Sequence, residues 1–169
     1  MANRGPEFDP IYIHPPLLDA CSQIFTQAFK LSTMIARTLR PAAAAQTLHQ
    51  DFPRDPSGWT MVGFILMIDE FRAESGATRF VPGSHEWQDG TAGSRTVPAC
   101  GPPGAMIIYN GSVWHCHGAN ETAKPRRSIQ GAFIRNDLQS GFDLPSRMRE
   151  ETLARIGPLA KSLIVPDSR

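Results

Sequence analysis

Short apolar segments separated by proline and glycine constrain the fold of this chain more than any other feature of its sequence. About eight segments rich in β-branched and aromatic residues follow one another, each bounded by turn-forming residues. A parallel α/β sheet would need a helical stretch between successive strands, and the middle of the chain has none. The pattern therefore predicts a mainly β protein, a sandwich or small barrel, with strands at residues 31–39, 46–51, 59–69, 78–81, 95–97, 105–109, 113–117 and 127–135.

Helical periodicity is confined to the two ends of the chain. Apolar residues recur at helical spacing over residues 17–29, and Pro145 opens a second helical run over residues 147–163. Residues 1–16, rich in proline and charge, are expected to form an irregular arm. Between two expected strands, the pair Asn110-Gly111 is the strongest hairpin signal in the chain. A length of 169 residues predicts one domain, residues 1–169.

Composition and charge exclude several classes of partner. The net charge is +1 and the basic residues are spread along the chain, which is not the footprint of a nucleic-acid binder. The longest apolar run, residues 61–68, is too short to span a bilayer. Three cysteines at irregular spacing indicate no disulfide framework and favour a reducing compartment. We therefore expect a soluble cytoplasmic protein that binds neither nucleic acid nor membrane.

Two histidine-bearing segments contain the residue types of a metal site. His49 and Asp51 are two residues apart, so on a strand their side chains point to the same face. His115 and His117 follow well downstream. Two histidines and one carboxylate on one face of an ion form the facial triad of non-haem Fe(II) oxygenases, which leaves coordination positions open. On spacing alone, an ordinary strand-end ion pair is the favoured interpretation of His49 and Asp51.

A third segment has the residues of a carboxylate receptor. In residues 125–130, Arg126, Ser128 and Gln130 share one face of the expected strand, whereas Arg127 lies on the other face. A guanidinium binds a carboxylate bidentately, and a neighbouring hydroxyl adds a hydrogen bond. An edge strand with two solvated arginines is the alternative that this pattern leaves open.

Taken together, these segments resemble the phytanoyl-CoA dioxygenase family of Fe(II)/2-oxoglutarate-dependent oxygenases. The resemblance runs from residue 17 to residue 136 and rests on motifs at residues 46–51 (QTLHQD), 68–70 (IDE), 74–85 (ESGATRFVPGSH), 103–109 (PGAMIIY), 114–120 (WHCHGAN) and 124–127 (KPRR). It implies a double-stranded β-helix, which is a jelly-roll or cupin-like core, with a short N-terminal and a C-terminal helix.

The resemblance also implies the site residues. Fe(II) would be held by His49, Asp51 and His115, with His115 preferred to His117 because of its distance from the cosubstrate arginine. That arginine comes eleven residues after the distal histidine, which selects Arg126. The resemblance then implies that Arg126 and Ser128 bind the far carboxylate of 2-oxoglutarate, with His117 close to the cosubstrate. His85, in the PGSH motif, has an expected structural role.

The activity implied is oxidation of an unactivated C–H bond of a small organic molecule by O₂, with release of succinate and CO₂. Related halogenases replace the carboxylate ligand by a small residue, so Asp51 favours hydroxylation. Two departures from the family stand out. The 48 residues before His49 are fewer than in relatives, where the longer N-terminal region covers the barrel, and a homodimer partner is one way to supply that cover. The second departure is Ile65, which stands where many relatives have a tryptophan.

Two other functions fit the same sequence. One is a cupin-type metalloenzyme that does not use 2-oxoglutarate, and the other is a shortened, non-catalytic relative that binds or senses a small molecule. Formation of succinate separates the proposed oxygenase from both. Substrate choice is expected to depend on the loops at residues 52–59 and 85–95, whose composition does not identify the substrate.

Overall fold

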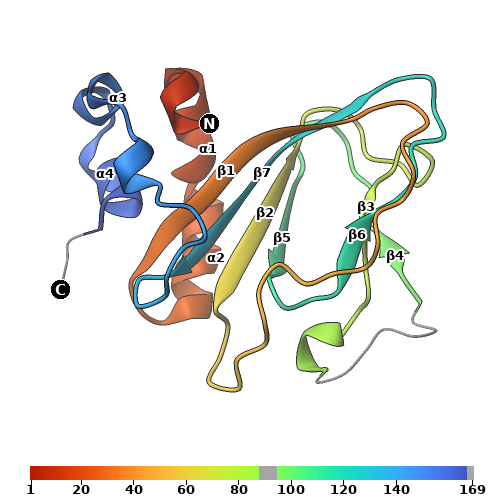
Figure 1. Ribbon diagram of the computed structural model, residues 1–169, viewed down its shortest axis with the longest axis horizontal. Helices are drawn as coiled ribbons and strands as arrows, with labels where there is room; N and C mark the ends of the chain where they lie inside the picture. The colour runs from red at the N-terminus through yellow and green to blue at the C-terminus, as the bar shows by residue number, and fades with distance from the viewer. Residues whose placement is uncertain (88–94, 167–169) are drawn as a thin grey trace.

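Two antiparallel sheets and a layer of helices stack on one another in the computed structural model, which describes residues 1–87 and 95–166 (Figure 1). A four-stranded sheet has the order β1-β7-β2-β5, and a three-stranded sheet has the order β4-β3-β6. The strands are β1 (Phe29–Leu39), β2 (Met61–Met67), β3 (Thr78–Phe80), β4 (Val97–Pro98), β5 (Met106–Asn110), β6 (His115–His117) and β7 (Arg126–Arg135). This arrangement confirms the prediction of a mainly β chain.

Helical segments at both ends of the chain cover one face of the larger sheet (Figure 1). The α-helices are α1 (Asp9–Tyr12), α2 (Pro15–Phe25), α3 (Glu150–Arg155) and α4 (Pro158–Ile164), and the 3₁₀ turns are η1 (Ala2–Arg4), η2 (Pro6–Phe8), η3 (Ser84–Glu86) and η4 (Pro145–Arg147). Within the described residues, no helix combines the length and the apolar character that crossing a bilayer requires.

Strand β2 is buried on both faces, because it lies between the helices and the second sheet. Val62 and Phe64 belong to the cluster that also contains Leu17 and Phe25 of α2. Ile65 and Met67 belong to a separate cluster on the side of the three-stranded sheet, together with Phe71 and Ala77. The alternation follows from the two-residue period of a strand. The core is therefore double, and the second cluster lies beside the polar residues described below.

Helical turns replace the irregular arm expected at residues 1–16, so that prediction was wrong. Ala2 and Tyr12 are buried in the helix-side cluster, and the Tyr12 hydroxyl donates a hydrogen bond to Asp9. The helix expected at residues 17–29 is α2, which ends before Thr26 adopts a left-handed conformation with φ of 53°. Phe29 then begins β1.

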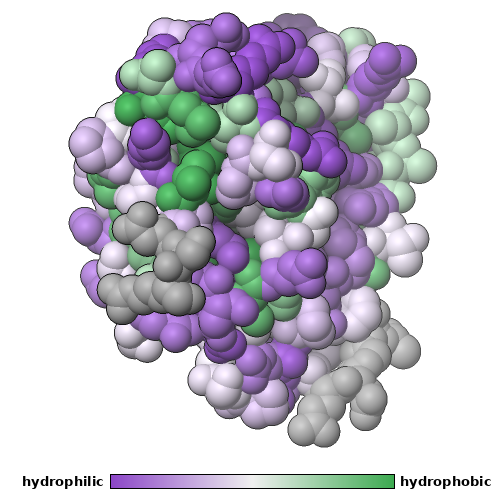
Figure 2. Space-filling view, turned by 60° about the vertical axis from the view of Figure 1, so that its left-hand side comes forward, coloured by the Kyte–Doolittle hydropathy of each residue, from purple (hydrophilic) through white to green (hydrophobic). Residues whose placement is uncertain are grey.

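The single helix expected at residues 147–163 is divided into two. Helix α3 ends at Arg155, and Gly157 precedes Pro158, the first residue of α4. Proline has no amide hydrogen, and its ring would clash with the preceding turn, so one continuous helix cannot pass this point. Seen from the helical side, the surface of the molecule combines hydrophobic patches with hydrophilic regions (Figure 2).

The Asn110-Gly111 pair does not form the expected hairpin. Strand β5 pairs with β2 and strand β6 with β3, so this corner connects the two sheets. The side chain of Asn110 accepts a hydrogen bond from the Ser112 amide at 2.8 Å, which forms a local turn. Neither Asn110 nor Gly111 has a positive φ. Gly111 donates its amide to the carbonyl of Met61, which binds the corner to the larger sheet.

Two other expected segments differ in extent. Residues 46–51 form an extended segment with one isolated bridge, between His49 and His115, and not a full strand. The expected strand at residues 95–97 is observed as β4, which begins two residues later and covers only Val97–Pro98. Much of the expected loop after Gly83 lies outside the described residues.

Candidate metal centre

Three side chains converge at the edge of the three-stranded sheet. His49, Asp51 and His115 each offer one ligand atom, and these atoms all lie within 4.8 Å of one another. The Nε2 atom of His49 is 3.8 Å from Oδ1 of Asp51, and Nε2 of His115 is 3.5 Å from Oδ2. Imidazole nitrogens and a carboxylate are suitable ligands for a first-row transition metal. The structure thus brings together the three residues that the family resemblance implies.

Backbone hydrogen bonds set this arrangement. The amide of His49 donates to the carbonyl of His115 at 3.0 Å, and the amide of His115 donates back at 2.9 Å. The amides of Asp51 and Phe52 both donate to the carbonyl of Gly111, at 3.0 and 3.1 Å. The corner that was expected to be a hairpin therefore holds the carboxylate-bearing segment against β6.

The two histidine rings present the same nitrogen to the site. Nδ1 of His49 lies 3.0 Å from the carbonyl of Thr47, and Nδ1 of His115 lies 2.9 Å from that of Val113. A carbonyl only accepts, so Nδ1 is the donor in both rings, and in the neutral ring Nε2 is the nitrogen that offers a lone pair. Burial lowers the pKa of His115, which favours the neutral imidazole that a metal requires.

His117 lies beside this trio but outside it. Its Nδ1 atom is 3.0 Å from the carbonyl of Gly118, and its ring lines the same cavity as the three ligand residues. Burial is the main cause of its lowered pKa, and the positive charges of Arg37 and Arg126 add to it. The cluster of ligand atoms includes His115 and not His117, which agrees with the preference for His115, and His117 forms part of the wall of the same cavity.

The cavity at the cluster has a volume of about 70 Å³. Besides the three ligand residues and His117, it is lined by Arg37, Gln46, Ile65, Thr78, Tyr109 and Gln130. Sequence reasoning had not singled out Arg37 or Tyr109. Arg37 faces the site because it is paired with Ser128 across β1 and β7, a register that the sequence does not reveal.

Arg126 is a buried cation whose hydrogen-bonding capacity is only partly used. The residue is 2% exposed and its side chain lies over the ring of Phe71, with 4.1 Å from Cζ to the ring centroid. It donates to the carbonyl of Gly76 at 2.8 Å and to Ser128 at 3.5 Å, whereas Nε has no partner among the described residues. Burial, with the charge of Arg37, lowers its pKa to about 10. An unpaired buried charge is costly, so a carboxylate ligand fits here.

Arg127, in contrast, already has its carboxylate. Its guanidinium makes two hydrogen bonds to Asp69, at 2.9 and 2.7 Å, and its side chain is 59% exposed. This pair also lowers the pKa of Asp69. Arg126 and Ser128 do not themselves line the cavity, so a ligand reaching Arg126 has to displace the present contacts around it.

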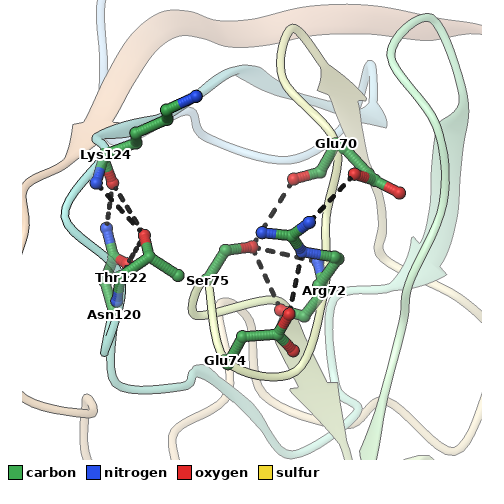
Figure 3. Close-up of polar contacts among 7 residues, drawn as sticks. All are labelled: Glu70, Arg72, Glu74, Ser75, Asn120, Thr122 and Lys124. Atoms are coloured by element: carbon green, nitrogen blue, oxygen red, sulfur yellow. Dashed lines mark hydrogen bonds and ion pairs between the residues drawn. The ribbon is translucent and has the colours of Figure 1, made fainter.

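A buried asparagine fixes the turn that leads into β7. Asn120 donates to the carbonyls of Leu39 and Lys124, at 3.2 and 2.9 Å, and accepts from the hydroxyl of Thr122 at 2.7 Å (Figure 3). It also bridges to Ser75, next to the carbonyl that Arg126 binds. These contacts fix the start of β7 and so the position of Arg126. The sequence had shown Asn120 only as part of a motif.

Fold and site together define a metal-binding jelly-roll protein with a histidine–aspartate–histidine centre. The chain belongs to the phytanoyl-CoA dioxygenase family, whose model matches residues 5–128. It is 33% identical over 142 residues to the dioxygenase andF of Emericella variicolor, a match that covers 75% of this chain and 48% of that protein. The chain spans about half the length of the curated relatives it matches.

Solved structures share its fold. One is HygX from Streptomyces hygroscopicus with nickel and 2-oxoglutarate bound, with a TM-score of 0.73 and 12% identity, covering 83% of this chain and 69% of that one. Another is the epimerase SnoN in complex with Fe³⁺, alpha ketoglutarate and nogalamycin RO, with a TM-score of 0.70 and 19% identity, covering 86% and 68%. These likenesses confirm the double-stranded β-helix, jelly-roll fold.

Proposed function

We propose that this chain binds one Fe(II) through His49, Asp51 and His115 and uses it, with 2-oxoglutarate and O₂, to oxidise a small organic molecule. The observation that supports this most is the convergence of three ligand atoms within 4.8 Å. A facial triad occupies one side of an ion and leaves the other side free for the reactants. Membership of the phytanoyl-CoA dioxygenase family supports the same cofactor and cosubstrate.

In this proposal the protein supplies ligands, orientation and a dry pocket. The bound iron and 2-oxoglutarate supply the activation of O₂, which is coupled to decarboxylation of the cosubstrate to succinate and CO₂. The Nδ1 atoms of His49 and His115 are engaged by carbonyls, which leaves Nε2 of each ring as the nitrogen available to a metal. Ile65, which is 3% exposed, contributes an apolar side chain to a cavity whose other lining residues are polar.

Arg126 and Ser128 are the proposed receptor for the far carboxylate of 2-oxoglutarate, with His117 alongside it. The buried guanidinium with an unpartnered Nε supports this role. Arg37 lines the cavity itself and adds a second positive charge that attracts the dianion. Because Arg127 is held by Asp69 on the other side of the sheet, it is not part of this receptor.

Hydroxylation is the proposed outcome, since Asp51 provides the carboxylate ligand that halogenases lack. Oxygen-18 from labelled O₂ would enter the product of a hydroxylation, whereas an epimerisation or a ring closure would leave the product unlabelled. The proposed substrate is a small organic molecule, and the 52–59 loop is a proposed part of its binding surface.

The deciding experiment measures succinate formed from 2-oxoglutarate by the purified protein supplied with Fe(II) under air. We expect turnover even without substrate, at the slow uncoupled rate, and its loss in Asp51→Ala. His85→Ala, which alters a histidine outside the trio, should retain it. Metal uptake without succinate would indicate a cupin-type enzyme that does not use 2-oxoglutarate. Binding of 2-oxoglutarate without turnover would indicate a sensor.

A further inference from the structure

Tyr109 touches the carboxylate of the proposed metal site. Its hydroxyl donates a hydrogen bond to Oδ2 of Asp51 at 2.6 Å. Oδ2 is the oxygen on the side of His115, whereas Oδ1 is the one on the side of His49. A hydrogen bond to an ionised acceptor is short and about twice as strong as a neutral one. Tyr109 therefore constrains one specific oxygen of the ligand residue.

The position of this hydroxyl is fixed by rings on neighbouring strands. The Tyr109 ring lies 5.0 Å from the His115 ring and 5.4 Å from that of Phe80, measured between centroids. Tyr109 comes from β5, His115 from β6 and Phe80 from β3, so both sheets contribute to the cluster. A tyrosine held on several sides returns its hydroxyl to one place.

A glycine on the adjacent strand makes room for it. Gly63 of β2 is the direct cross-strand partner of Tyr109. A Cβ atom at Gly63 would lie 2.3 Å from Cζ of Tyr109 and 2.7 Å from its hydroxyl oxygen. Gly63 does not have a positive φ, so the backbone does not require glycine here. The close approach of the tyrosine ring does require it.

We propose that Tyr109 is a positioning residue that keeps Asp51 a monodentate metal ligand. By engaging Oδ2, the hydroxyl leaves Oδ1 for the metal. A bidentate carboxylate would take a coordination position that the cosubstrate or O₂ needs, because the facial triad functions through its open positions. This inference rests on the proposed metal site and adds a residue that controls its coordination number.

The chain contains a matched control for a purely structural role. Tyr12 is its other tyrosine and also donates to a carboxylate, that of Asp9, at 2.9 Å. It is buried in the helix-side cluster. If Tyr109 served only to stabilise the fold, removing either hydroxyl would have the same kind of effect. Tyr12→Phe and Tyr109→Phe each remove one hydroxyl and retain the ring.

The test uses Co(II), whose visible absorption becomes weaker as its coordination number rises. We would titrate the wild type and both phenylalanine variants with Co(II) and record affinity and absorbance per bound ion. Tyr109→Phe should bind Co(II) about 10- to 100-fold more weakly, the usual effect of losing a residue that orients a metal ligand. Its absorption should also be weaker. Tyr12→Phe should match the wild type in both measurements.

A second variant keeps the test decisive if Tyr109→Phe does not fold. Gly63→Ala retains the hydroxyl but displaces it, and it should reproduce the weaker affinity and absorption. Equal affinity and identical spectra for wild type and Tyr109→Phe would overturn the inference while leaving the metal site intact. A wild-type protein that takes up no Co(II) would overturn the metal site, and this inference with it.

Discussion

Neighbouring residues of one strand differ sharply in environment at this site. Arg126 and Arg127 are adjacent in β7, yet Arg126 as a whole is 2% exposed, whereas the side chain of Arg127 is 59% exposed. The alternation of a strand sends them to opposite faces, and Asp69 satisfies only Arg127. Two arginines that are equivalent in composition are therefore not equivalent as anion receptors.

This difference predicts the effect of two substitutions on cosubstrate binding. Arg126→Ala should raise the 2-oxoglutarate concentration for half-maximal succinate formation about 10- to 100-fold, because a charge-assisted hydrogen bond contributes about 1.5–3 kcal/mol. Arg127→Ala should change it less than about threefold, since an exposed ion pair contributes little. The same shift in both variants would contradict the assignment of Arg126.

At the same scale, the ligand residues could be predicted from the sequence, but the residues around them in the cavity, such as Tyr109 and Arg37, could not. The spacing of His49 and Asp51 is local information, and the distance from His115 to Arg126 is a motif property. Tyr109 and Arg37 reach the site only through strand register, which pairs Tyr109 with Gly63 and Arg37 with Ser128. Register depends on contacts between segments far apart in the chain, so sequence spacing alone does not identify these residues.

At the scale of the element, the strands were predicted more reliably than their connections. Short β-branched and aromatic segments bounded by proline and glycine located β1, β2, β5 and β7, because burial of strand residues leaves a local signature in composition. The Asn110-Gly111 corner has the composition of a hairpin, but Gly111 bonds instead to Met61 and to the 51–52 amides. A single C-terminal helix was predicted after Pro145, and Gly157-Pro158 divides it.

One cross-strand pair allows a direct test of how the helical layer is attached. Phe64 and Ile108 are partners on β2 and β5, so both face the helical side. Phe64 is fully buried, whereas Ile108 is 38% exposed. Phe64→Ala should lower the free energy of unfolding by about 3–5 kcal/mol because it leaves a cavity. Ile108→Ala should lower it by less than about 1 kcal/mol.

Urea unfolding followed by circular dichroism measures both changes. The slope of the free energy of unfolding against urea concentration should stay the same if unfolding remains two-state. An equal decrease in the free energy of unfolding in the two variants would show that Phe64 does not anchor the helical layer to the sheet. The pair is a close control because both residues are large, apolar and on the same side of the same sheet.

At the scale of the whole molecule, the metal centre lies where the two sheets meet. Asp51 is held by the corner that joins β5 to β6, and Tyr109 reaches it from the larger sheet. His49 is bridged to His115 in the smaller sheet. A bound ion would connect segments more than sixty positions apart in the sequence, none of which is organised in the unfolded chain. Metal affinity and global stability should therefore be linked.

The linkage can be measured as a metal-dependent melting temperature. An ion that binds only the folded state, present at 100 times its dissociation constant, adds about 2.7 kcal/mol to the free energy of unfolding. For a chain of this size that corresponds to a rise of about 5–11 °C. His49→Ala should abolish the rise produced by Co(II) relative to a chelator, because two remaining ligands bind weakly. His85→Ala should retain it, since His85 contacts Glu86 and Trp59 and lies outside the trio. A rise that persisted in His49→Ala would place the stabilising ion at another set of residues and refute the centre described here.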